Sequence, residues 1–125
     1  KETGYLEIRA EARPFVATRQ AWLDEIDRLT KGRFPVRVEL PHALRVLPRV
    51  DASGKTDSVT LLNLSMGDTG AFEVRIRNPR GQKVVYETPK GTVPGVKTIY
   101  DAAKDELRVT LPDLVGWHIG TIFLD

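Results

Sequence analysis

Cysteine is absent from this chain of 125 residues. Without thiols the protein forms no disulfide, no thiolate zinc site and no cysteine nucleophile. Histidine is scarce as well, with His42 and His118 as its two copies. We expect structural roles for both, with His42 exposed between strands and His118 inside the last strand, because the sequence offers neither a partner for acid–base catalysis.

Motifs for nucleotide, metal or covalent chemistry are also missing. No Gly-x-Ser-x-Gly elbow precedes a helix, so a serine hydrolase has almost nothing to work with. The stretch Gly54–Thr56 resembles the end of a phosphate-binding loop, but Arg49 stands where that loop requires a glycine. Residues 51–57 alternate oxygen-bearing side chains, yet a central lysine and the lack of a later glutamate make a poor calcium loop. We predict a hairpin loop there, and neither a metal nor a cofactor.

Carboxylates are common, but no pair of them predicts a catalytic site. Asp101, Asp105 and Glu106 fall in a turn-rich stretch, where acidic residues commonly favour turns and solubility. A glycosidase pair needs a cleft and one carboxyl group with a raised pKa. The sequence therefore predicts no catalytic residue and no enzyme activity of this chain on its own.

No apolar run approaches the roughly 18 residues of a membrane span, so we predict no membrane partner. The 19 basic and 17 acidic residues are mixed along the chain, whereas nucleic-acid binding favours a one-sided basic stripe. Arg75, Arg77 and Arg80 are the nearest approach to one, and their alternation with apolar residues indicates the solvated face of a strand. We predict no nucleic-acid partner, and the sequence leaves the cellular compartment open.

One amphipathic helix is predicted near the N-terminus, after a short strand at 4–10 that ends before Pro14. Thr18 is the expected N-cap and Gly32 the expected C′ residue. Trp22, Ile26 and Leu29 recur at helical spacing on one face. That face has to be covered, by the rest of the chain or by a second molecule, because exposed large apolar side chains forgo roughly 1.5–3 kcal/mol each.

From Arg33 onward the pattern changes to short strands separated by turn residues, which is typical of an antiparallel β-sandwich. We therefore expect a mainly β fold, Ig-like or of the glycosidase C-terminal type, with a strand–helix segment and connector at 1–35 and the sandwich at 36–125. Asn78–Gly81 has type I turn chemistry and should form a hairpin. The expected core comprises Leu61, Phe72, Val74, Ile76, Leu107, Val109, Trp117 and Ile119.

The last predicted strand, at 117–124, is apolar on both faces. Such a strand is expected either in the centre of a sandwich or with its second face against another body. Asn63, although it begins a glycosylation sequon, falls inside the strongest strand, and we expect its amide to hydrogen-bond neighbouring backbone. Trp117, Tyr86 and Tyr100 are the candidates for a sugar-stacking platform, but aromatics at strand spacing more often belong to the core.

The order of features resembles the C-terminal region of large bacterial glycoside hydrolases of the β-galactosidase-like type. The similarity runs through GYLEI, the helix ATRQAWLDEIDRLTKGRFPVRVELP, the stretch from LRVLPRV to VRIRNP, and the closing LPDLVGWHIGTIFL. In that group a catalytic barrel precedes a flavodoxin-like domain and then a small β-sandwich. The resemblance implies that the catalytic glutamates lie outside this chain, so it transfers no site residue.

The resemblance implies a non-catalytic accessory domain of a carbohydrate-active enzyme, with neighbouring domains of the parent enzyme as its partners. Two alternatives stay open: a carbohydrate-binding module, and an Ig-like protein-interaction domain that would use an edge strand or a surface patch. Exposure of the three candidate aromatics discriminates between the accessory domain and the carbohydrate-binding module. Self-association into a homo-oligomer is expected if the helix leaves an apolar patch uncovered.

Overall fold

The computed structural model describes residues 16–32, 34–40 and 43–125. The chain divides into two compact units, residues 1–34, which include the helix, and residues 35–125, which include the strands that the structure describes. The predicted strand at 4–10 and the predicted exposure of His42 lie outside the described residues. The elements are α1 (Val16–Leu29), β1 (Val36–Val38), β2 (Leu44–Val50), β3 (Thr56–Asn63), β4 (Phe72–Arg77), β5 (Val84–Thr88), β6 (Gly91–Thr92), β7 (Lys97–Asp101), β8 (Glu106–Leu111) and β9 (Ile119–Leu124).

Helix α1 begins at Val16, so Thr18 lies inside it and the predicted N-cap is wrong. At the other end the Gly32 N–H donates to the Asp27 carbonyl and the Lys31 N–H to the Arg28 carbonyl. This pair of bonds is a Schellman cap, in which Lys31, with φ of 53°, is the C′ residue. The predicted stop is therefore displaced by one residue: Lys31 takes the C′ position, and Gly32, whose φ of 70° is also left-handed, follows it as C″.

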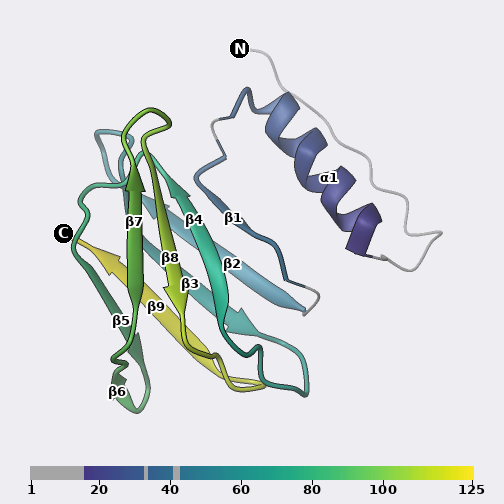
Figure 1. Ribbon diagram of the computed structural model, residues 1–125, viewed down its shortest axis with the longest axis vertical. Coiled ribbons are helices and arrows are strands. Elements are labelled where there is room, and N and C mark those ends of the chain that lie inside the picture. Colours follow the sequence, from purple (N-terminus) through teal and green to yellow (C-terminus); the bar gives the residue numbers. More distant parts are fainter. Residues whose placement is uncertain (1–15, 33, 41–42) are drawn as a thin grey trace. The chain divides into compact units, whose positions relative to one another are not determined.

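Two antiparallel sheets form the second unit, as the strand pattern predicts (Figure 1). One sheet has the order β1-β4-β8-β7 and the other β2-β3-β9-β5-β6. The chain changes sheet between β1 and β2, on both sides of β4, between β6 and β7, and between β8 and β9. Each of the eight strands that the pattern predicts after Arg33 is present: VRVEL, ALRVL, SVTLLNLS, AFEVRIRN, KVVYET, VKTIY, ELRVTL and WHIGTIFL. In the described part of the chain, the two-residue β6 is the one strand that was not anticipated.

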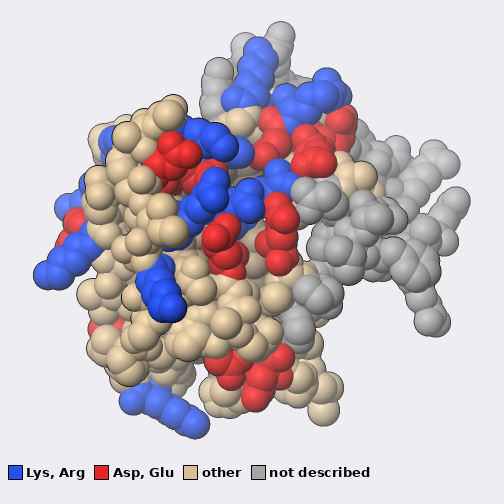
Figure 2. Space-filling view, viewed as in Figure 1, with Lys and Arg blue, Asp and Glu red and all other residues tan. Residues whose placement is uncertain are grey.

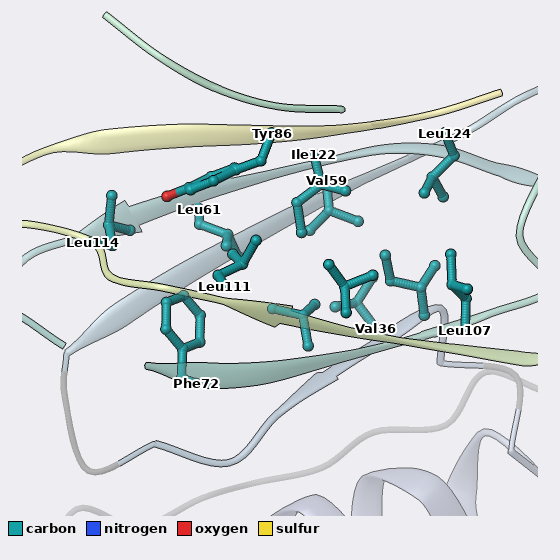
Figure 3. Packing of buried hydrophobic residues seen from close by; sticks show 13 residues of the cluster. Val36, Val59, Leu61, Phe72, Tyr86, Leu107, Leu111, Leu114, Ile122 and Leu124 are labelled. Carbon is teal, nitrogen blue, oxygen red and sulfur yellow. The ribbon is translucent and has the colours of Figure 1, made fainter. Parts of the chain in front are cut away.

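The core lies between the two sheets (Figure 3). Among the described residues it comprises thirteen buried apolar side chains, of which Val74, Ile76 and Val109 are fully buried from the first sheet. Val59, Leu61 and Ile122 meet them from the second sheet, and the Tyr86 ring lies flat among them with its hydroxyl toward Leu114. Six of the eight predicted core residues are confirmed: Leu61, Phe72, Val74, Ile76, Leu107 and Val109.

The prediction that Trp117 and Ile119 lie in the core is wrong, since they are 62% and 42% exposed. Strand β9 begins at Ile119 and turns Gly120, Ile122 and Leu124 inward. Both faces of β9 are apolar, so alternation alone could not identify the inner one. The inner face is the one with the glycine, because the Tyr86 ring occupies the space that a side chain at position 120 would need.

Asn78–Gly81 does not form a hairpin, because it leads from β4 in one sheet to β5 in the other. The segment runs alongside the start of β3. There the Thr56 N–H donates to the Asn78 carbonyl and the Arg80 N–H to the Thr56 carbonyl. These bonds pair the backbone at Pro79 with that at Thr56 in parallel and carry the chain across the end of the sandwich.

Candidate functional sites

The outer face of the sheet β1-β4-β8-β7 is charged (Figure 2). Register places Arg37 opposite Arg75, and Arg75 opposite Arg108, which makes a row of three guanidinium groups across the sheet. Each has a glutamate two residues away on its own segment, with Nε–Oε1 distances of 2.9 Å in Arg37–Glu39, 2.9 Å in Arg75–Glu73 and 3.3 Å in Arg108–Glu106. The hydrogen bond that Arg75 donates to the Glu73 carboxylate raises the pKa of the Arg75 guanidinium above its usual range. The charges on this face are balanced, and Arg75 and Arg77 lie on its outer side, as predicted, each half-buried. Arg80, predicted with them, is exposed but lies beyond the end of β4.

The outer face of the other sheet is apolar. Its strands are in register so that Leu62 lies opposite Ile119, Thr60 opposite Thr121, and Ser58 opposite Phe123. The two threonine hydroxyls hydrogen-bond each other at 3.2 Å. Leu47, Ile119 and Phe123 are between 42% and 47% exposed, although each belongs to a strand. We call this surface the apolar face; its apolar members are Leu47, Leu62, Val85, Ile119 and Phe123.

Two shallow hollows lie on either side of Phe123. One, of about 200 Å³, is bounded by Glu87, Pro89 and Ile119. The other, of about 340 Å³, is lined on its far side by Arg49, Asp57 and Arg80. The Phe123 side chain thus stands between two depressions, a surface shape that allows close complementary packing with a protein partner.

The margins of the apolar face carry opposite charges. Arg45 and Arg49 point outward from β2, whereas Glu87 points outward from β5 on the opposite side. The Arg49 guanidinium holds Asp57 at 2.8 Å, and this hydrogen bond lowers the pKa of the Asp57 carboxyl below its usual value. Arg45 and Glu87 make no ion pair with any residue that the structure describes. One margin is therefore basic and the other acidic.

Trp117 stands at one end of the sandwich with a strained backbone. Its φ is 60°, a left-handed conformation that is uncommon for a bulky aromatic residue. The indole N–H approaches the Met66 sulfur at 3.0 Å, and Met66 is itself 86% exposed. Strain of this kind is found preferentially at functional sites, which makes Trp117 a candidate contact residue. Only glycine fits at the preceding position, 116, since a Cβ there would come within 2.7 Å of the Met66 carbonyl oxygen.

A polar network clamps the two loops at this end, residues 64–71 and 112–118. The buried Asn63 amide donates to the carbonyls of Gly67 and Leu114, both at 2.9 Å, and its oxygen accepts from the Ser65 N–H at 3.0 Å. The prediction that this amide bonds neighbouring backbone is confirmed, and its burial leaves no room for a glycan. Asp113 holds the Gly70 N–H at 2.8 Å, a role that no sequence motif indicated.

A hollow of about 250 Å³ lies between the β5–β6 hairpin and the 112–118 loop. Its walls are mainly apolar, with Val93, Pro94 and Leu114, and Asp113 and His118 also line it. His118 approaches the Gly116 carbonyl through Nδ1 at 2.8 Å, so in its neutral form this nitrogen carries the proton. The histidine therefore has a structural contact, as expected, and lies in the loop before β9 rather than in the strand.

The other aromatic candidates do not join Trp117. Tyr86 is fully buried, which raises the pKa of its hydroxyl to about 12. Tyr100 is partly buried and donates to an Asp105 carboxylate oxygen at 2.6 Å, which raises the pKa of its own hydroxyl. Of the three predicted platform residues, only Trp117 presents its ring to solvent.

The acidic residues that the sequence offered as catalytic or metal-binding candidates have structural partners. Asp101 accepts from the Ala103 N–H at 3.1 Å, which closes the turn between β7 and β8. Glu106 is buried and its carboxylate lies 3.3 Å from Arg108. In the 51–57 loop, Asp51 accepts from the Ser53 side chain and backbone, and these bonds lower the pKa of its carboxyl. The predicted hairpin loop between β2 and β3 is confirmed.

Comparison with models of protein families, with curated proteins and with solved structures finds no match. In the described part of the chain, no helix combines the length and apolarity that crossing a bilayer requires. Among those same residues, no three His, Asp or Glu side chains lie close enough to share a metal ion. The surfaces of the sandwich are therefore the features of the molecule that bear on its function.

Proposed function

We propose that this chain is a non-catalytic accessory β-sandwich domain of a multidomain carbohydrate-active enzyme, and that its apolar face packs against another protein body. The observation that supports this proposal is the contrast between the two outer faces of the sandwich. One alternates paired charges, whereas the other exposes Leu47, Ile119 and Phe123 in neighbouring rows. Contiguous apolar patches on soluble domains mark contact surfaces. The parent class rests on the sequence resemblance.

The apolar face should bind a hydrophobic dye. We expect the isolated chain, at low micromolar concentration, to enhance anilinonaphthalene sulfonate fluorescence, and Phe123→Ser or Ile119→Ser to remove most of that enhancement. Ile99→Ser is the matched control, because Ile99 is 69% exposed but lies on β7, among the charges of the other sheet. Equal dye binding by all three variants would contradict the proposed contact surface.

The non-catalytic part of the proposal has its own test. The chain, incubated with a panel of aryl glycosides, should release no more aryl alcohol than buffer does. Turnover that disappears on substitution of Asp101, Asp105 or Glu106 would overturn it.

A second candidate function, carbohydrate binding, is favoured by the exposed and strained Trp117. An indole of this kind can stack on a sugar ring. In polysaccharide gels we expect the chain to migrate as it does without polysaccharide, since Tyr86 and Tyr100 supply no second platform ring. Retardation that Trp117→Ala abolishes, and Ile99→Ala leaves intact, would favour the binding module instead.

A further inference from the structure

We propose that the body covering the apolar face is the same face of a second copy of this chain, related by a two-fold axis parallel to the strands. The inference rests on the proposed function, because it names the partner of that contact surface. Its basis is the distribution of charge and apolar residues across the four strands β2, β3, β9 and β5. When one copy of this surface is laid on another in this way, the basic margin of each copy meets the acidic margin of the other.

The rows of the face follow from the strand register. The central row reads Leu47, Thr60, Thr121 and Glu87 from β2 to β5. The rows on either side begin with Arg45 and Arg49 on β2. Basic side chains thus border one margin, an acidic side chain borders the other, and apolar or hydroxyl-bearing side chains lie between them.

A two-fold axis that runs between β3 and β9, parallel to them, reverses the order of the strands without reversing their direction. It places β2 of each copy over β5 of the other, and β3 over β9. Leu62 then faces Ile119 of the other copy, and Thr60 faces Thr121. Face-to-face sheets of this kind pack about 10 Å apart, close enough for the apolar side chains to interdigitate.

The same operation brings opposite charges together. Glu87 of each copy lies over Leu47 of the other, flanked by Arg45 and Arg49. Residues two apart on a strand are separated by about 7 Å, a distance that an arginine side chain spans. Each Glu87 therefore meets Arg45, which has no ion-pair partner among the described residues, and also comes near Arg49, which holds Asp57 at 2.8 Å, and the symmetry makes this contact twice. An axis perpendicular to the strands would instead place β2 over β2 and repel.

The charged face gives no comparable match. Its central row sets three arginines across the sheet, and a two-fold axis between β4 and β8 would place Arg75 over Arg108 of the other copy. The same operation sets Arg77 over Glu106, but that carboxylate is buried and already lies 3.3 Å from Arg108, so it offers little to a second molecule. Like charges directly opposed across an interface disfavour association. Self-association is thereby directed to one face, which gives a closed dimer and not an open chain.

Sedimentation equilibrium of the full chain over a wide range of concentrations tests the proposal. We expect a monomer–dimer equilibrium that Phe123→Asp abolishes. Ile99→Asp should leave the dimer dissociation constant within about twofold of that of the unmodified chain. Circular dichroism verifies that each variant is folded. Arg45→Glu or Glu87→Arg alone should each raise the dimer dissociation constant about tenfold, since symmetry repeats each change and an exposed charge pair is worth up to about 1 kcal/mol. The double variant, which exchanges the two charges, should restore the constant to within about threefold of the unmodified chain.

Three outcomes would overturn the second-copy proposal: a strict monomer at every concentration, a dimer insensitive to Phe123→Asp, or a double variant no better than the single ones. A strict monomer whose dye binding still depends on Phe123 and Ile119 would leave the proposed function standing with a different protein as its partner. A monomer without that dye binding would remove both. The two failures are therefore distinguishable.

Discussion

Gly120 determines which face of β9 turns inward. A Cβ at this position would lie 2.4 Å from the Tyr86 hydroxyl oxygen, inside the space that the buried ring fills. Gly120→Ala therefore has to displace that ring within a packed core, and overpacking of this kind typically costs about 1–3 kcal/mol. We expect a loss of that size in the free energy of unfolding, measured by urea denaturation.

Gly67→Ala is the matched control for this prediction. A Cβ there meets nothing within 4 Å and the residue has no positive φ, so we expect a change within about 0.5 kcal/mol. Equal effects of the two substitutions would show that the Tyr86 ring does not constrain β9.

The raised pKa of the Tyr86 hydroxyl should make the stability of the fold depend on pH in the alkaline range. Burial raises its pKa to about 12, whereas the ordinary value is 10.0. The folded protein therefore retains a proton that the unfolded chain gives up, so stability is intact below pH 10 and falls as the pH rises from 10 to 12. Urea denaturation across that range should show a steeper loss for the natural chain than for Tyr86→Phe, and parallel losses would contradict this account.

Residue patterns predicted the inside of the sandwich better than its surface. Phe72, Val74 and Ile76 alternate with charged residues, so one face of that strand was unambiguous. Ile119 was wrongly placed because both faces of the last strand are apolar, and only the packing of Tyr86 against Gly120 distinguishes the inner face from the outer one. Trp117 was wrongly placed because it precedes the strand, which begins at Ile119. The strained backbone of Trp117 has no signal in the sequence at all, since nothing about a Trp-His pair favours a positive φ.

At the scale of elements, one buried side chain, Asn63, helps to hold the loops 64–71 and 112–118 together, beside the contacts of Asp68, Thr69 and Asp113 between them. Asn63 is fully buried at the end of β3 and satisfies backbone groups of both loops. Asn63→Ala would remove this donor from the Gly67 and Leu114 carbonyls, which keep the Ser65 hydroxyl and the Thr69 N–H as second donors, both at 3.1 Å. It would also remove the acceptor of the Ser65 N–H. The substitution removes the hydrogen bonds of the Asn63 amide, each worth about 0.5–1.5 kcal/mol net, so we expect an overall loss of about 2–4 kcal/mol in the free energy of unfolding, measured by urea denaturation.

The neighbouring Leu64→Ala separates this network from general disturbance of the loop. Leu64 is 39% exposed, and its truncation should cost under about 1 kcal/mol. A loss from Asn63→Ala as small as that would mean that the two loops hold each other by other contacts.

The strands themselves were predictable, and several of their connections were not. Alternation and turn residues gave eight strands and the loop between β2 and β3, because both signals are local. The path through Asn78–Gly81 depends on where β3 already lies, since Thr56 supplies the partners of Asn78 and Arg80. A turn motif describes four residues, whereas a change of sheet is decided by the core that the strands share.

At the scale of the whole molecule, the sandwich has one hydrated and one apolar outer face. Sequence alternation showed the charges of β4, but it could not show that Arg37, Arg75 and Arg108 form one row across three strands. Nor could it show that Leu47, Ile119 and Phe123 share a surface, because they belong to strands that are distant in sequence. Such a surface becomes visible only when strand order and register are known, and the functional proposals depend on it.

The sandwich should be able to fold without the residues that precede it. All thirteen buried apolar side chains of the core cluster lie between Val36 and Leu124, and domains of about 60 residues already fold alone. We expect a chain of residues 35–125 to unfold cooperatively in urea, with a free energy within about 1 kcal/mol of the full chain. Trp22→Phe in the full chain is the control for fluorescence, because it too leaves Trp117 as the remaining tryptophan. A truncated chain that unfolds gradually, or that lacks the near-ultraviolet dichroism of its packed Tyr86, would mean that residues 1–34 belong to the same folding unit.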